Sequence, residues 1–77
     1  MSKVVITIYP YARRGARIAS LAPIRATDAK FAVRRAAQLA SGSQGAIVLA
    51  EGIGDDGELI ASMEIARFGV TPEVADE

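Results

Sequence analysis

Apolar and β-branched residues fill the start of the chain and predict a β-hairpin. Residues 3–11 are rich in Val, Ile, Thr and Tyr, and a second strand is expected over residues 16–25. Between them, residues 12–15 form a short turn that ends in a glycine. Because Pro10 and Pro23 cannot donate ladder hydrogen bonds, we expect them at strand ends, at bulges or on a sheet edge.

The apolar residues take a helical spacing after the first hairpin. Thr27 or Asp28 is the expected N-terminal cap and Gly42 the expected C-terminal cap, with strong helix formers between them. The apolar positions of this stretch share one helical face: Ala29, Ala32, Val33, Ala36, Leu39 and Ala40. This alanine-rich face predicts a helix that packs closely on a sheet.

The second half of the chain predicts another pair of strands. Residues 46–51 form an apolar run, residues 52–57 are a glycine-rich turn, and residues 59–68 alternate between apolar and polar positions. A helix over residues 58–68 is the competing interpretation, because several apolar residues there also fit helical spacing. The strand is the preferred interpretation.

The expected element order is therefore ββαββ. It predicts an α+β fold with a four-stranded, mainly antiparallel sheet and one helix packed on one face. Residues 1–69 are expected to form this single domain, and residues 70–77 a flexible acidic tail.

Strand pairing decides which residues the helix covers. The first hairpin is expected to place Ile8 near Ser20. The second is expected to place Leu49 opposite Ala61. From the second hairpin, the core under the helix then contains Ile47, Leu49, Leu59, Met63 and Ile65.

The opposite face of the sheet is expected to be apolar and uncovered. One helix of about four turns, ~21 Å long, cannot cover both faces, and soluble monomers rarely expose an apolar face of this extent. We therefore predict that this face packs against a second copy of the chain. The predicted interface residues are Val5, Tyr9, Tyr11, Leu21, Val48, Ile60 and Phe68.

Composition also favours association. A chain of 77 residues buries only about 60–65% of its unfolded surface, so its stability is marginal without help. It contains neither Cys nor His, which excludes disulfides, thiolate metal sites and the commonest general base. The preferred hypothesis is a homodimeric, non-catalytic interaction or structural module without a cofactor or a metal.

No apolar run is long enough to span a membrane and no signal peptide is recognisable, so the expected location is the cytoplasm. The chain resembles short bacterial proteins in general, which says nothing about its role.

Charge is distributed unevenly along the chain. Residues 1–45 contain eight basic residues and one acidic residue, a net charge of +7, and residues 46–77 carry the reverse, −7. Such asymmetry is typical of a nucleic-acid-binding half or of two halves that face each other. Arg13, Arg14 and Arg17 close to two tyrosines make single-stranded nucleic acid the alternative partner. A pI of about 6.2 disfavours that alternative.

The motif candidates for enzyme chemistry are weak. Residues 52–57 match G-x-G-x-x-G, but Asp55 and Asp56 would repel a pyrophosphate, so a glycine-rich hairpin loop is preferred over a nucleotide site. The same loop lacks most ligands of a calcium loop. No serine has a recognisable activating base, and a nucleotide- or small-molecule-dependent enzyme is the least favoured class.

Overall fold

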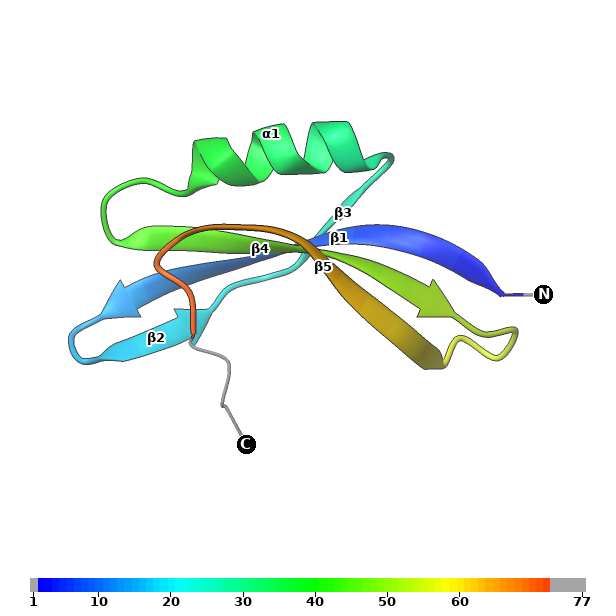
Figure 1. Ribbon diagram of the computed structural model, residues 1–77. Coiled ribbons are helices and arrows are strands. Elements are labelled where there is room, and N and C mark those ends of the chain that lie inside the picture. Colours follow the sequence, from blue (N-terminus) through cyan, green and yellow to red (C-terminus); the bar gives the residue numbers. More distant parts are fainter. Residues whose placement is uncertain (1, 73–77) are drawn as a thin grey trace.

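In a computed structural model that describes residues 2–72, the chain forms a five-stranded antiparallel sheet with a helix on one face (Figure 1). The strand order is β2-β1-β4-β5, and β3 also pairs with β1. The expected α+β class and antiparallel sheet are confirmed, although the sheet has five strands and not four. The elements are β1 (Lys3–Arg14), β2 (Arg17–Ser20), β3 (Ile24–Ala26), α1 (Ala29–Leu39), β4 (Gln44–Ile53) and β5 (Leu59–Gly69).

The first hairpin is longer and more broken than the sequence indicates. β1 continues to Arg14, and the turn follows at Gly15, whose φ is +66°. The expected second strand is split into β2 and β3 by residues 21–23, which include Pro23. Both pieces pair with β1, so one edge of the sheet consists of two short strands.

Helix α1 begins at the expected cap. Asp28 has extended backbone geometry, and its carboxylate accepts a hydrogen bond of 2.7 Å from the Phe31 backbone N–H. The helix ends earlier than expected, because its C-terminal cap is Ala40 and Gly42 lies in the following turn. Its buried face is made of Ala32 and Ala36, which lets the helix approach the sheet closely.

The core lies between α1 and the middle of the sheet. Ile8 and Val48 from the two central strands are fully buried there, and Ile6, Leu39 and Phe68 pack around them. Many side chains of this core are small. Among the described residues, the buried hydrophobic side chains are Ile8, Ala12, Ala32, Ala36, Ala46, Ile47 and Val48, so four of the seven are alanines.

The expected assignment of faces is wrong for the second hairpin. Val48 and Phe68 were predicted on the uncovered face but lie in or against the core under α1. Ile47, next to Val48, has the opposite orientation and helps to line the uncovered face. The reason is register. Ile8 pairs directly with Val48 and Leu49 pairs with Glu64, whereas the sequence offered only a run of apolar residues without alternation.

Strand β5 confirms the strand interpretation of residues 59–68. It runs antiparallel to β4, with two register shifts that leave Ile60 and Ile65 without a direct partner. Beyond β5, Gly69 takes a φ of +67°, and the Val70 N–H donates to the Gln44 carbonyl at 3.2 Å. Of the expected tail at 70–77, residues 70–72 are half-buried, and residues 73–77 lie outside the described part of the chain.

The helix is much shorter than the sheet beneath it. α1 has 11 residues, ~16 Å, whereas β1 has 12 residues and extends over ~40 Å. In Figure 1 the helix lies over one part of the sheet, and the end that contains the start of β1 and the start of β5 is bare. Within residues 2–72, no helix combines the length and apolar character that crossing a bilayer requires.

Candidate interaction surfaces

A buried carboxylate organises the centre of the face opposite the helix. Glu51 on β4 is only 6% exposed and accepts hydrogen bonds from the Thr7 hydroxyl at 2.8 Å and the Tyr9 hydroxyl at 2.5 Å. The hydrogen bond to Glu51, together with burial, raises the pKa of Tyr9. No buried side-chain polar atom among the described residues lacks a partner. The centre of this face is therefore polar and satisfied within one chain.

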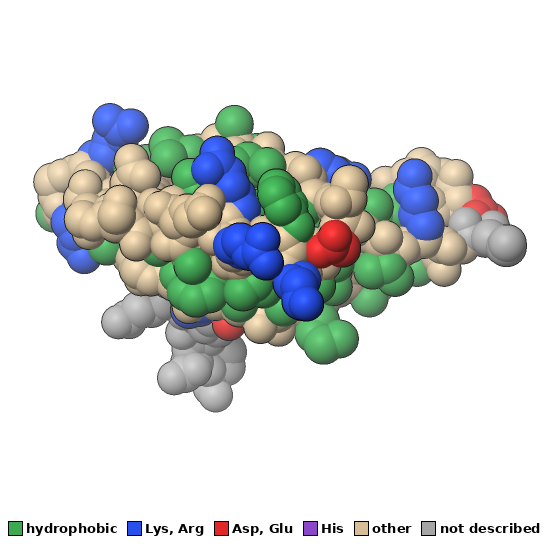
Figure 2. All heavy atoms as spheres, turned by 90° about the horizontal axis from the view of Figure 1, so that it is seen from above, with side chains coloured by type: hydrophobic (Ala, Val, Ile, Leu, Met, Phe, Trp, Pro, Cys, Tyr) green, Lys and Arg blue, Asp and Glu red, His purple; other side chains and the backbone are tan. Residues whose placement is uncertain are grey.

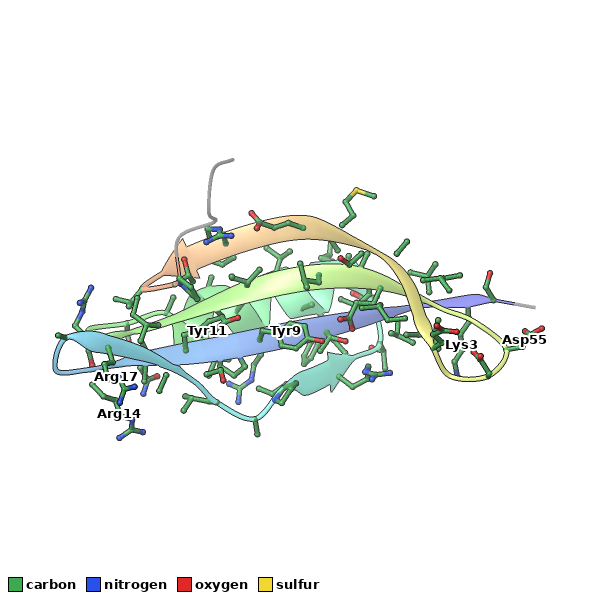
Figure 3. All side chains as sticks on the ribbon, turned by 90° about the horizontal axis from the view of Figure 1, so that it is seen from below. Lys3, Tyr9, Tyr11, Arg14, Arg17 and Asp55 are labelled. Carbon is green, nitrogen blue, oxygen red and sulfur yellow. The ribbon has the colours of Figure 1, made fainter. Side chains whose placement is uncertain are left out.

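Next to this network the same face is hollowed. Figure 3 shows Tyr9 and Tyr11 on β1 at this surface. The hollow has a volume of about 310 Å³ and is lined by Tyr9, Tyr11, Ile47, Leu49, Glu64 and Arg67. It is a mixed surface of aromatic, aliphatic and paired charged side chains.

Arg67 uses its donors within the chain. Its guanidinium contacts both carboxylate oxygens of Glu64, at 2.7 and 3.3 Å, and this contact lowers the pKa of Glu64. Its Nη1 donates to the Thr71 hydroxyl at 3.0 Å and to the Pro72 carbonyl at 2.8 Å. Arg67 therefore fixes the segment after β5 and is not a free anion-binding group.

All but one of the remaining predicted interface residues are half-buried. Val5, Tyr9 and Tyr11 lie on strand β1 and are half-buried. Leu21 is half-buried in the connection between β2 and β3. Ile60 is exposed, but it belongs to a bulge of β5.

The exposed apolar surface lies elsewhere, along β5 and the bare end of the sheet. Met63 is 68% exposed and Val4 is 70% exposed, although the sequence placed Met63 in the core. The helix is too short to reach them. A hollow of about 290 Å³ at this end is lined by Val4, Ala50, Gly52, Ala61, Ser62 and Met63. Viewed from the helix side, Figure 2 shows apolar side chains scattered over the surface beyond the helix.

Strand β5 contributes most of this exposed apolar surface. The large hydrophobic side chains that are exposed in the described part of the chain are Val4, Phe31, Leu59, Ile60, Met63 and Ile65. Four of these six belong to β5. The sequence showed these apolar residues in the alternation of residues 59–68 and placed Met63 in the core, but Met63, which pairs with Ala50, is exposed because the helix does not cover this end of the sheet.

Opposite charges lie at opposite ends of the sheet. Arg13, Arg14 and Arg17 surround the tip of the first hairpin and are exposed, and none pairs with a carboxylate of residues 2–72. The loop between β4 and β5 carries Asp55 and Asp56 at the other end, as the labels of Figure 3 show for Arg14, Arg17 and Asp55. Charge is therefore unevenly distributed along the molecule, although Lys3 lies at the same end as the acidic loop (Figure 3).

The glycine-rich loop is a hairpin connection. The Gly54 N–H donates to the Glu58 carbonyl at 2.8 Å, and the Glu58 N–H donates to the Asp56 carboxylate at 3.0 Å. A strand follows the loop, so the helix N-terminus that binds a pyrophosphate in the dinucleotide motif does not occur there. Within residues 2–72, no group of three or more His, Cys, Asp or Glu side chains is arranged to hold a metal ion.

No known protein family, curated protein or solved structure matches this chain. Its function is therefore inferred from the surfaces themselves. These surfaces offer an open strand edge with apolar side chains, a hollowed tyrosine-bearing face and a basic hairpin tip.

Proposed function

We propose that the chain is a non-catalytic interaction module that works as a homodimer. The observation that carries this proposal is the exposure of large apolar side chains along β5. Leu59, Ile60, Met63 and Ile65 lie on one strand, and Met63 shares an apolar hollow with the exposed Val4. Contiguous exposed apolar surface of this kind is typical of protein–protein contacts.

The small core supports the same proposal. Fully burying a large aliphatic side chain stabilises a fold by about 1.5–3 kcal/mol, and an alanine contributes far less. With alanine at four of the seven buried hydrophobic positions within residues 2–72, the isolated chain has little stabilisation in reserve. Covering the apolar strand in a dimer adds burial where the single chain lacks it.

Sedimentation velocity of the purified full-length chain tests this function. Over protein concentrations from about 1 µM to about 1 mM, we expect a reversible shift from monomer to dimer. A chain that remains monomeric at the highest concentration contradicts the proposal.

Binding of single-stranded nucleic acid is the second candidate function, and a specific observation favours it. Arg13, Arg14 and Arg17 share one exposed hairpin tip, and Tyr11 lies on the strand that leads to it. Fluorescence anisotropy with a labelled single-stranded oligonucleotide tests this candidate. Binding should weaken steeply with salt and should be lost when the three hairpin arginines are changed to Gln. The matched control changes Arg34 and Arg35 to Gln, because these exposed helix residues lie outside the hairpin.

A further inference from the structure

We infer that strand β5 is the dimer contact and pairs antiparallel with β5 of a second copy across a two-fold axis near Met63. This inference rests on the proposed homodimer and specifies its surface. It joins the two five-stranded sheets into one continuous sheet. The contact therefore lies at a strand edge and not on the tyrosine-bearing face that the sequence indicated.

The two edge strands of the sheet differ in how well they can pair with a strand of another molecule. The β2/β3 edge consists of strands of four and three residues, broken at residues 21–23, with Pro23 in the break and Arg17 and Arg25 exposed on the strands. Short strands, prolines and charges are devices that prevent edge-to-edge association. This edge is therefore protected.

Strand β5 lacks most of these devices. It has 11 residues, and among the described strands it pairs with β4 alone, so its outer row of backbone N–H and C=O groups is open. It contains no proline and no lysine. Its two charged residues, Glu64 and Arg67, are joined by a salt bridge of 2.7 Å, so they place little net charge on the edge.

The bulges of β5 limit the length of the contact without removing it. They fall at Ile60 and Ile65, and the segment between them, residues 61–64, keeps a regular ladder with β4. Ile60 and Ile65 are both exposed apolar residues. The regular segment therefore supplies the backbone pairing, and the bulged residues supply apolar contact on either side of it.

A second copy fits this edge because the segment is complementary to itself. In an antiparallel pair related by a perpendicular two-fold axis, a residue on the axis lies opposite its own copy. With Met63 on the axis, the most exposed large apolar side chain of β5 packs against its copy, and Ser62 lies opposite Glu64, where its hydroxyl can donate to the carboxylate. An axis at Glu64 would instead oppose two carboxylates, which disfavours that register.

Charge substitution at Met63 tests the inference. In the full-length chain, Met63→Lys places two ammonium groups opposite each other at the axis, and we expect at least a tenfold increase in the dimer dissociation constant. Phe31→Lys is the matched control, because it makes the same chemical change at another exposed apolar residue, which lies on the helix. Dimerisation of this control should equal that of the wild type, and circular dichroism should show that both variants are folded.

A charge swap gives a positive signal. Met63→Glu should dimerise as poorly as Met63→Lys, and an equimolar mixture of the two variants should recover the dimer through opposite charges.

The absence of Cys from the chain allows a second measurement. Met63→Cys should form an intermolecular disulfide with oxidised glutathione, which is reduced to two molecules of glutathione, because the Cβ atoms of directly opposite residues approach to about 4.5 Å, within the range of a disulfide. Phe31→Cys should form this dimer much more slowly.

The outcomes separate this inference from the proposed function. A wild-type chain that is monomeric at all concentrations overturns both. A wild-type dimer that survives Met63→Lys unchanged, with no disulfide in Met63→Cys, overturns the β5 contact and leaves the homodimer to another face.

Discussion

At the level of single residues, the hydrogen bonds to Glu51 explain how a carboxylate can be buried in a small sheet. A buried charge is tolerated when donors surround it, and here two hydroxyl groups serve as donors. Thr7 is fully buried, and Tyr9 lies over the network from the same strand. The network therefore gives the uncovered face a fixed polar centre. Loss of one of the two hydroxyl donors should lower the free energy of unfolding.

Removing one donor tests this view. Tyr9→Phe should lower the free energy of unfolding by about 1–2 kcal/mol, because the carboxylate of Glu51 loses a charge-assisted hydrogen bond. The control is Tyr11→Phe on the same strand, since the Tyr11 hydroxyl makes no hydrogen bond with the described residues, and it should change the value by less than about 0.5 kcal/mol. Urea unfolding measures both variants. Equal losses in the two variants would show that the hydroxyl of Tyr9 is not stabilising.

The raised pKa of Tyr9 predicts an alkaline loss of stability. Its phenol donates to Glu51, and burial adds to the effect, so folding favours the protonated form. A group whose pKa is raised by folding contributes stability below its unfolded value of 10.0, and this contribution is lost as the pH rises through the raised value. The difference in unfolding free energy between the wild type and Tyr9→Phe should therefore shrink over the range above about pH 10. A difference that is constant over this range would contradict the assignment.

At the level of secondary-structure elements, the helix with its buried face and most of the strands were predictable, but the faces of the second hairpin were not. Asp28 was recognisable as a cap, and residues 59–68 were recognisable as a strand, because local chemistry determines both. In β4, by contrast, apolar residues occupy successive positions, so only the pairing of Ile8 with Val48 decides which of them face the helix. Long-range pairing of this kind is not encoded in local periodicity.

Two glycines of β4 differ in how closely other parts of the chain approach them. A Cβ atom at Gly45 would collide with the backbone of Val70, which returns over the end of the sheet. At Gly52 the nearest atom to such a Cβ is a side-chain carbon of Ile60 at 3.6 Å, an ordinary van der Waals distance. Neither glycine has a positive φ, so the two positions differ in packing and not in backbone strain.

Alanine substitutions at these two positions should therefore differ in effect. Gly45→Ala should destabilise the fold by about 1–3 kcal/mol, because the backbone at Val70 must move and its hydrogen bond to Gln44 is strained. Gly52→Ala should be neutral or slightly stabilising. Urea unfolding of the two variants measures the difference. Similar values for both would show that the close approach of Val70 does not hold in solution.

At the level of the whole molecule, the two clusters of like charge lie at the two ends of the sheet, and the apolar surface of β5 begins beside the acidic loop. The arginines of the first hairpin and the acidic residues of the β4–β5 loop lie at opposite ends, whereas the open edge of β5 carries a neutralised Glu64–Arg67 pair. A dimer that pairs through β5 and a dimer that stacks through the tyrosine-bearing face would therefore differ in how much ion pairs contribute to their stability. Stacking with antiparallel long axes would bring each basic hairpin toward an acidic loop, whereas pairing through β5 would rely on backbone hydrogen bonds and apolar contact.

This difference makes the salt dependence of the dimer informative. Between about 0.05 M and about 0.5 M salt the screening length falls from about 14 Å to about 4 Å, which weakens exposed ion pairs but not buried apolar contact. For pairing through β5 we expect the dimer dissociation constant to change by less than about threefold over this range, measured by sedimentation equilibrium. For a dimer held by contacts between the charged ends, several exposed ion pairs would be screened at once, and the constant would rise by about tenfold or more. A steep dependence that is abolished when Arg13, Arg14 and Arg17 are changed to Gln would therefore assign the contact to the charged ends and not to β5.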